Sequence, residues 1–429
     1  MSRVRGTPNE GLLGATLGFF VGFAAVSLFG PTAHRFQEVM GLSPVMVGFL
    51  VAAPALTGSL LRIPFGAWVD TTGGRRPFLI LLVLSFAGMT GLLAVSWSLY
   101  PEGLASSHYP LLLALGALSG CGIATFSVGI GQVSYWFPQR RQGWALGTYA
   151  GLGNVAPGLF AFLLPISLAY WGLAGSYLAW LVLLGAGIGI YYATGVNAPF
   201  FQLRRQGASV ADAKRDAQEL GQEIFPAGSI AQSLSIAARV WKTWALVLVY
   251  FTTFGGFIAL TAWFPTYWMS YFGVGLGIAG LLTAIYSVGA SLIRVPGGVV
   301  ADRLGGERTA IGSLLIMLTG ALLLTVSQTL ALSISGAVLM AIGMGVANAA
   351  VFKLVPQEVK EAVGGAAGWV GGLGAFGGFA IPPVMGLFVR ARGSAGYASG
   401  FVTFVALATL SILLAYVLKR SHSGDATRA

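Results

Sequence analysis

The chain has 429 residues, of which 56% are hydrophobic and only 9% are charged, and its formal net charge at pH 7 is +11. A water-soluble domain usually carries charge on about a quarter of its residues. The composition therefore excludes a soluble fold and predicts a protein whose surface faces lipid. Because the chain has a single cysteine, no disulfide can form within it.

Apolar runs long enough to cross a bilayer, roughly 20 helical residues each, recur along almost the whole chain. The first run is too long for a cleavable signal peptide and continues directly into the pattern that follows. We therefore expect an all-α membrane protein with twelve transmembrane helices. The expected spans are residues 11–33, 44–69, 77–98, 110–137, 142–168, 173–195, 242–269, 276–300, 309–328, 331–353, 362–388 and 396–419.

Basic residues gather in alternate loops. Of the 24 Lys and Arg residues, two lie within spans, three lie in loops on one side (Arg35, Arg390 and Arg392), and the remaining nineteen lie on the other side. Cytoplasmic loops collect basic residues. We therefore expect a multi-pass protein of the cell (inner) membrane with both termini in the cytoplasm. The positive charge is interpreted as orienting the chain rather than as binding nucleic acid.

A long polar segment interrupts the hydrophobic pattern midway and separates six spans from six others. The predicted domains are an N-terminal six-helix bundle (1–197), a cytoplasmic connector (198–240) and a C-terminal six-helix bundle (241–429). Equal numbers of spans on each side indicate a duplicated, pseudo-symmetric architecture.

The second and eighth spans support a duplication, because they carry the same motif. They read Arg62-Ile-Pro-Phe-Gly-Ala-Trp-Val-Asp70 and Arg294-Val-Pro-Gly-Gly-Val-Val-Ala-Asp302, followed by Gly73-Gly-Arg-Arg76 and Gly305-Gly-Glu-Arg308. This pattern resembles the loop motif of the major facilitator superfamily. The resemblance implies two six-helix repeats around a site near the membrane midplane.

Each motif places an arginine inside a span, where it costs about 3 kcal/mol on insertion scales and normally faces a partner or a wet cavity. All thirteen carboxylates lie in loops, tails or span ends, and Asp70 is about 12 Å along the helix from Arg62. The guanidinium fork suits oxyanions. We therefore expect Arg62 and Arg294 to face the central cavity and bind an anion. In the alternative interpretation, each arginine bonds backbone carbonyls for structural reasons.

Aromatic residues and glycines supply further candidates. Tyr250 and Phe254 are four residues apart and share a helix face, so a phenol hydroxyl and flat rings can confine a flat ion. Phe126 in the fourth span is a similar candidate. The fifth and eleventh spans are rich in glycine, which permits close helix approach. Asn154, a polar residue inside the first glycine cluster, needs a hydrogen-bond partner and is therefore a stronger candidate than any single glycine.

The glycine-rich segments carry a more specific resemblance. Two segments are similar to the signature motifs of the nitrate/nitrite porter family: Ala145-Leu-Gly-Thr-Tyr-Ala-Gly-Leu-Gly-Asn154 and Gly368-Trp-Val-Gly-Gly-Leu-Gly-Ala-Phe-Gly-Gly-Phe-Ala-Ile-Pro382. The resemblance implies that Arg62 and Arg294 clamp the substrate, and that the remaining site residues are Tyr250, Phe254, Phe126, Asn154, Gly151, Gly153, Gly371 and Gly374. The sequence departs from the family at Val155-Ala156-Pro157, which follows Asn154.

These observations predict a secondary transporter that moves nitrate and nitrite by alternating access, most simply as an exchanger. Importing an anion against a negative-inside potential costs about 2.3 kcal/mol per 100 mV, and exchange of two monovalent anions removes that cost. The alternatives are a nitrate/proton symporter, with His34 as the titrating side chain, and an organic-anion or phosphate-ester antiporter, for which Lys353 is the additional basic group. A membrane anion sensor is the alternative from a different class.

No catalytic activity is expected, because His34, His108 and His422 are scattered and no nucleophile triad, metal cluster or nucleotide loop is recognisable. We expect no cofactor and no metal. The expected partners are nitrate, nitrite and the lipid bilayer, without nucleic acid, and the protein is expected to function as a monomer.

Overall fold

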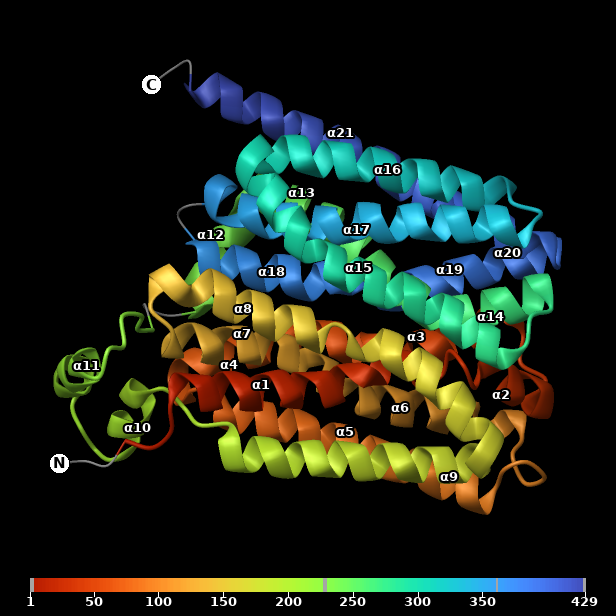
Figure 1. The fold of residues 1–429 in the computed structure, drawn as a ribbon, viewed down its shortest axis with the longest axis horizontal. Helices are drawn as coiled ribbons and strands as arrows, with labels where there is room; N and C mark the ends of the chain where they lie inside the picture. The colour runs from red at the N-terminus through yellow and green to blue at the C-terminus, as the bar shows by residue number, and fades with distance from the viewer. Residues whose placement is uncertain (1–3, 227–229, 360–361, 427–429) are drawn as a thin grey trace.

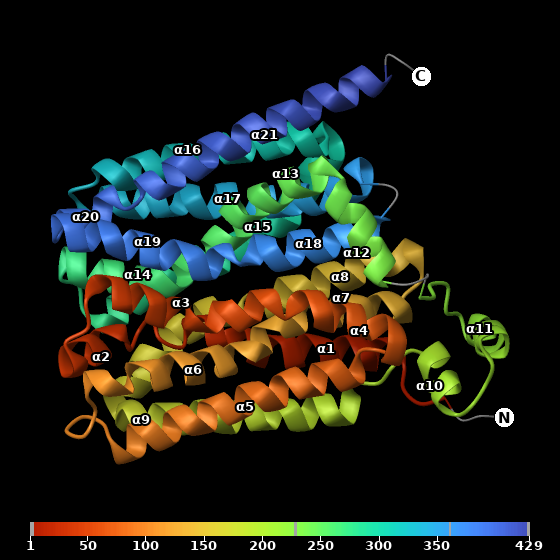
Figure 2. The ribbon, with the colours of Figure 1, turned by 180° about the vertical axis from the view of Figure 1, so that it is seen from behind.

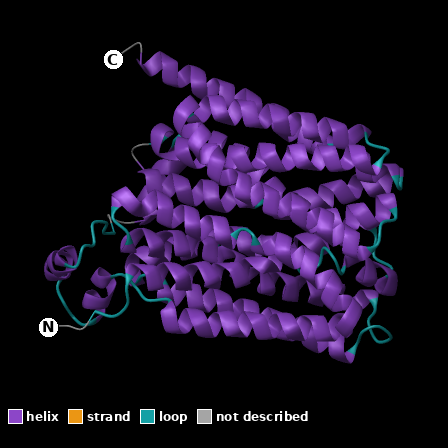
Figure 3. Ribbon diagram, in the orientation of Figure 1, coloured by secondary structure: helices purple, strands orange, loops and turns teal. Residues whose placement is uncertain are grey.

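The computed structural model describes residues 4–226, 230–359 and 362–426. Over these residues the chain consists of helices and connecting loops, and it contains no strand (Figure 3). The long helices lie side by side in one bundle, and α10, α11 and α12 lie at one end of it (Figure 1). We call this end the connector end and the opposite end, where α2 and α20 lie, the far end.

The first half of the chain begins at the connector end, crosses to the far end and returns repeatedly. Its helices are α1 (Pro8–Phe23), η1 (Ala24–Ser27), α2 (Ala33–Met40), α3 (Pro44–Leu60), α4 (Arg62–Thr72), α5 (Arg75–Ser98), η2 (Ser106–His108), α6 (Tyr109–Ser119), η3 (Gly120–Ala124), α7 (Thr125–Trp136), α8 (Gln139–Gly153) and α9 (Ala156–Thr194).

Three shorter helices follow before the second half. They are α10 (Pro199–Arg205), α11 (Val210–Glu219) and α12 (Ile230–Arg239). The second half comprises α13 (Trp241–Tyr250), η4 (Phe251–Gly255), α14 (Gly256–Phe272), α15 (Leu276–Leu304), α16 (Gly306–Val326), α17 (Leu330–Glu358), α18 (Val363–Ala375), α19 (Gly377–Arg392), α20 (Ala395–Ser399) and α21 (Val402–Ala426).

The structure contains eleven helical segments, within the described residues, that are long and apolar enough to cross a membrane. The longest, Trp144–Thr194, has 51 residues and would extend about 77 Å at 1.5 Å per residue, far beyond a bilayer core of about 30 Å. It reverses direction at Gly172, whose φ of 65° lies in the left-handed region that glycine adopts readily. Divided there, it forms two spans, which confirms the predicted twelve-helix, all-α membrane fold.

Several spans end a few residues from the predicted positions, and two of these differences bear on the site. The first span ends at Ser27 rather than at residue 33, because the chain turns after η1 and begins the short helix α2. The second span continues to Thr72 rather than ending at residue 69. Asp70 therefore lies in the last turn of α4, inside the span, and not beyond its end.

Several spans are interrupted near their middle, and the interruptions follow from the sequence. Asn154 caps the end of α8, and α9 begins at Ala156 with Pro157 in its first turn, where the missing N–H of proline costs nothing. The Val155-Ala156-Pro157 departure therefore marks a helix break. Other breaks fall at Leu61 between α3 and α4, at η3 between α6 and α7, at the π-helical turn η4, and at Phe376 between α18 and α19.

The two halves pack closely against each other at the far end. A Cβ atom added at Gly48 of α3 would lie 2.6 Å from the carbonyl oxygen of Pro382, and one added at Gly386 of α19 would lie 2.6 Å from that of Pro44. The helices α3 and α19 therefore approach backbone to backbone (Figure 2). Gly280 of α15 approaches the carbonyl of Ala161 in α9 in the same way. Glycine at these positions closes the far end.

Candidate substrate-binding site

Arg62 is the first residue of α4 and is buried, with 1% of its surface exposed. Its Nε donates to the carbonyl oxygen of Gly58 at 3.0 Å, and its Nη1 donates to that of Gly371 at 3.3 Å. Its Nη2 is buried with no hydrogen-bond partner, and no described carboxylate forms an ion pair with it. The backbone thus satisfies part of the guanidinium and leaves one edge free.

Arg294 lies in the middle of the continuous helix α15 and is partly buried. No ion pair of its guanidinium is found among the described residues, and the guanidinium interacts with the adjacent Tyr250 hydroxyl. The two arginines also act on each other electrostatically. Two cations with no described carboxylate partner thus converge between the halves, as the repeat predicts.

The ring of Phe254 lies within reach of both guanidinium groups. It is 5.1 Å from Arg62 Cζ and 5.9 Å from Arg294 Cζ, measured to the ring centroid, distances at which a cation is attracted to an aromatic face. Phe254 also stacks on Tyr250, with centroids 4.9 Å apart and planes 9° apart. Phe126 lies 4.8 Å from Arg62 Cζ, and its ring centroid is 6.1 Å from that of Phe254. The predicted aromatic residues therefore surround the arginines.

The helix breaks position these side chains. Arg62 begins α4, Tyr250 ends α13, and Phe254 lies in the π-helical turn η4. A π-turn adds one residue to a helical turn and often occurs at functional sites, and interrupted helices commonly form transporter sites. The breaks thus direct side chains from distant segments into one space.

Asn154 is buried, and its Oδ1 atom has no hydrogen-bond partner among the described residues. Its backbone carbonyl accepts a hydrogen bond of 2.9 Å from Ser291 Oγ, and Ser291 lies one turn before Arg294 on α15. Asn154 is therefore next to the helix that carries Arg294, but no direct contact joins it to either arginine.

The four predicted glycines have different environments. The carbonyl of Gly371 accepts from Arg62, and a Cβ atom at Gly374 would lie 2.6 Å from Tyr250 Cδ1. These two glycines touch the site. A Cβ at Gly153 would lie 2.0 Å from Phe19 Cδ1, whereas one at Gly151 would meet no atom within 4 Å. Gly153 thus permits helix packing, and Gly151 makes no close approach.

A cavity of about 650 Å³ extends from Arg62 toward the connector end. Residues of α4, α7, α12, α17 and α18 line it, and Arg62, Phe126, Phe352 and Gly371 lie at its inner end. Arg294, Tyr250 and Phe254 are not among its lining residues. The site is therefore reached from the connector end, through the side of Arg62, while the far end is closed.

The sequence reasoning missed Phe352 and Asn348, both on α17. The ring of Phe352 lies 5.9 Å from Arg294 Cζ and packs edge-on against Tyr250, with centroids 5.1 Å apart. Asn348, one turn earlier, is buried with Oδ1 unpartnered among the described residues. The available signal was a polar residue inside an apolar span, four positions from an aromatic residue on the same helix face.

One carboxylate near a span end reaches the cavity. Asp70 lines the cavity, and its Oδ1 accepts a hydrogen bond from Tyr135 Oη at 2.5 Å. His34, the titrating group considered from sequence, lies on α2 at the far end beside Glu38, with 3.3 Å between Nδ1 and Oε1.

Lys353, the additional basic group considered for a larger organic anion, is already engaged. Its Nζ donates to Asp302 Oδ1 at 2.8 Å and to the carbonyl of Ala301 at 2.8 Å. The cavity therefore gains no further cation from Lys353, which removes the specific support for a phosphate-ester antiporter.

The membrane-spanning helices and their arrangement define the fold of a multi-pass membrane transporter. The sequence matches the family model of the Major Facilitator Superfamily over residues 15–279 and 267–428. It is 33% identical to the probable nitrate/nitrite antiporter NarK1 of Thermus thermophilus, over 93% of this chain and 89% of that protein. The chain therefore belongs to the nitrate/nitrite porter family of the major facilitator superfamily.

Further relatives include the nitrite extrusion protein of Bacillus subtilis, which is 27% identical over 93% of this chain and 91% of its own length. Among solved structures, the partially occluded inward-open xylose transporter XylE of E. coli superposes with a TM-score of 0.71 at 16% identity, over 96% of this chain and 99% of that one. At this identity the likeness concerns the fold alone.

Proposed function

We propose that the protein exchanges nitrate and nitrite across the membrane, with Arg62 and Arg294 as the anion ligands. The observation that carries the proposal is the pair of guanidinium groups at equivalent positions of the repeat, which share the Phe254 ring and form no ion pair with a described carboxylate. The free Nη2 of Arg62 is a donor without an acceptor, and an oxyanion supplies one.

The shape of the site favours a small flat anion. Phe126, Phe254, Tyr250 and Phe352 present ring faces and edges around the two cations. The buried Tyr250 hydroxyl, which lies beside Arg294, adds a neutral donor. The names of relatives, a nitrate/nitrite antiporter and a nitrite extrusion protein, support nitrate and nitrite as the substrates.

The positive charges of Arg62 and Arg294 favour exchange over transport by an empty carrier. Without an anion the two guanidinium groups repel each other, and one monovalent anion between them offsets part of that repulsion, so the loaded carrier closes more readily than the empty one. In the present state the cavity opens at the connector end, and the close packing of α3 on α19 seals the far end. We place the connector end in the cytoplasm, because the basic loops lie there.

The test is counterflow of labelled nitrate against internal nitrite in proteoliposomes. Arg62→Lys and Arg294→Lys keep the charge but lose the planar fork, so each should reduce counterflow at least about tenfold. Arg308→Lys, the same substitution in the first turn of α16 at the connector end, is the control and should exchange normally. Full exchange by both site variants would refute the assignment.

Proton symport is the second candidate, and the position of Asp70 in the cavity wall favours it. A pH-sensitive dye inside the proteoliposomes separates the two. Exchange predicts nitrate entry without a change of internal pH and continued counterflow in Asp70→Asn. Acidification of the lumen during nitrate entry, abolished by Asp70→Asn, would establish symport instead.

A further inference from the structure

A second cavity lies at the connector end and shares Asp70 with the cavity that leads to Arg62. Its volume is about 650 Å³, and it lies between the α4–α5 loop and α10. Four of its lining residues are arginines: Arg75, Arg76, Arg204 and Arg205. Its remaining walls are Asp70, Thr71, Thr72, Leu79, Asn197, Phe200, Phe201 and Pro226.

The backbone around this arginine pocket is held in place. Asn197 Oδ1 accepts from the backbone N–H of Arg75 at 2.9 Å, and its Nδ2 donates to the carbonyl of Thr72 at 3.0 Å. Gln202 of α10 donates to the carbonyl of Asn197 at 2.6 Å. The ring of Phe201 packs edge-on against Tyr135 of α7, with centroids 5.0 Å apart. The connector therefore brings Arg204 and Arg205 next to the loop in a fixed arrangement.

The four cations are not neutralised by the protein. Arg75 donates to the carbonyl of Tyr192 at 2.6 Å and lies 5.0 Å from that ring, and Arg204 donates to the carbonyl of Ala208 at 2.7 Å. Neither contact removes charge, and none of the four forms an ion pair with a described carboxylate. The nearby Asp70 opposes anion binding, but its Oδ1 is already bound to Tyr135.

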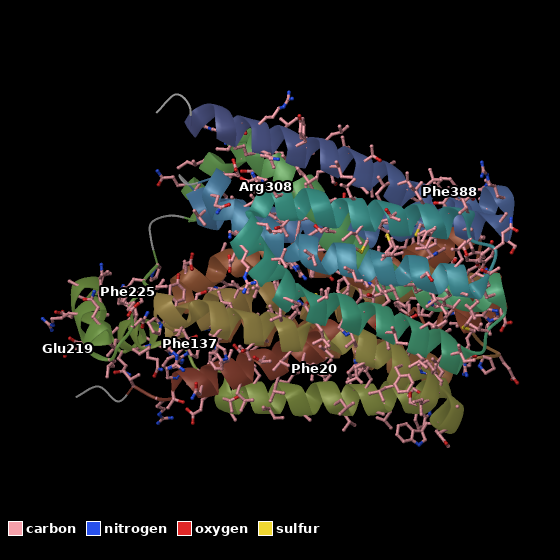
Figure 4. The ribbon with its side chains drawn as sticks, turned by 45° about the horizontal axis from the view of Figure 1, so that its top comes forward. Phe20, Phe137, Glu219, Phe225, Arg308 and Phe388 are labelled. Carbon is pink, nitrogen blue, oxygen red and sulfur yellow. The ribbon has the colours of Figure 1, made fainter. Side chains whose placement is uncertain are left out.

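Comparison of the two repeat copies indicates whether these arginines bind a ligand or only orient the chain in the membrane. The equivalent motif of the second half carries Glu307 and Arg308 where the first half carries Arg75 and Arg76. Arg308, labelled in Figure 4, lies in the first turn of α16. Both loops need the same positive-inside bias. The surplus of arginine in the first half, together with two more from α10, therefore exceeds what orientation requires.

We propose that the arginine pocket binds a phosphate group at the connector-side membrane surface. Arginine forks match phosphate oxygens bidentately, and basic pockets beside transmembrane helices hold anionic lipid headgroups. The pocket adjoins a lipid-facing surface, because Tyr192 is 64% exposed and Val83, two turns along α5 from Arg76, is 54% exposed. A phospholipid headgroup or a soluble phosphate satisfies the same chemistry.

The test uses the full chain in nanodiscs of phosphatidylcholine with or without phosphatidylglycerol, followed by native mass spectrometry of retained lipid. The wild type should retain phosphatidylglycerol in preference to phosphatidylcholine. The double variant Arg204→Gln/Arg205→Gln should reduce this retention at least about tenfold, because two guanidinium groups that can form bidentate, charge-assisted hydrogen bonds are lost. Arg308→Gln is the matched control and should retain the lipid.

Two further experiments distinguish a lipid headgroup from soluble phosphate and test whether arginine itself is needed. Radiolabelled inorganic phosphate that binds the wild type in pure phosphatidylcholine and displaces phosphatidylglycerol would identify a soluble phosphate as an occupant of the same pocket. Arg204→Lys with Arg205→Lys preserves charge and orientation but removes the forks, and it should lose most of the retention.

Three outcomes would overturn the proposal: no preference of the wild type for either phosphate probe, equal retention in the glutamine and control variants, or full retention in the lysine variant. Thermal unfolding of each variant reports that the protein is folded, and nitrate counterflow is measured beside it. Because Arg204 and Arg205 lie outside the substrate site, counterflow and lipid retention vary independently, and failure of one proposal leaves the other intact.

Discussion

Arg62 and Arg294 occupy equivalent positions of the internal repeat, yet their surroundings differ. Arg62 starts a helix after a break, is fully buried and is tied to two backbone carbonyls. Arg294 lies in an unbroken helix, is partly exposed and has no such tie. The repeat thus determines where the cations lie, whereas the helix break before Arg62 lets that side chain bond backbone carbonyls, and Arg294 lies beside the Tyr250 hydroxyl instead.

The same difference recurs near the connector end. Asp70 accepts from Tyr135, and the equivalent Asp302 pairs with Lys353. Tyr135 and Lys353 are themselves equivalent, because each lies three residues before a proline, Pro138 or Pro356. One half joins its helices with a neutral hydroxyl and the other with a cation, so the two contacts should respond differently to salt.

The largest expected effect comes from Phe254, the ring that both guanidinium groups share. Phe254→Ala removes a buried ring, a change that costs about 3–5 kcal/mol in well-packed cores, and it leaves both cations without their common aromatic face. Nitrate counterflow should fall more than about 100-fold. Phe379→Ala, which removes a partly buried ring that pairs with Phe49, is the control and should retain counterflow; equal losses would show a general packing effect.

Arg62→Lys and Arg294→Lys should differ in stability. A lysine at position 62 cannot keep both carbonyl bonds, and hydrogen bonds to charged groups contribute about 1.5–3 kcal/mol. Thermal unfolding without substrate should therefore occur at a lower temperature in Arg62→Lys and at the wild-type temperature in Arg294→Lys. Equal shifts in the two variants would contradict this difference between the two arginines.

Gly374→Ala and Gly151→Ala separate the glycines that touch the site from those that do not. The new Cβ at position 374 would lie 2.6 Å from Tyr250 Cδ1, and overpacking of this kind costs about 1–3 kcal/mol. Counterflow should fall between about fivefold and 100-fold. The alanine at position 151 meets no atom within 4 Å and should leave transport unchanged.

The smallest effects are expected at the paired aspartates. Lys353 and Asp302 form an ion pair in which Asp302 is mostly exposed, and such pairs contribute about 0.2–1 kcal/mol and weaken with salt. Lys353→Met should slow exchange less than about fivefold at low salt, and the difference should disappear at high salt. The effect of Tyr135→Phe should persist at high salt, because a neutral hydroxyl is not screened; loss of that effect would end the distinction.

The amino-acid sequence determined the twelve-helix membrane fold, the repeat and the two arginines within it. Hydropathy and helical periodicity are local properties, and the Arg-x-Pro-x-Gly spacing is visible in both copies without any structure. The division at residues 198–240 and the roles of the site residues stay predictions. The paired arginines were accessible to sequence reasoning because an intramembrane cation is costly wherever it occurs.

Only the tertiary structure determined which residues the site side chains contact. Gly371 accepts from Arg62 across 309 positions of the chain, Lys353 is engaged by Asp302 rather than facing the cavity, and Phe352 completes the aromatic surroundings of Arg294. It also separated Gly374 from Gly151, which look alike in the sequence. Such contacts depend on where separate helices cross, and no local pattern records a crossing.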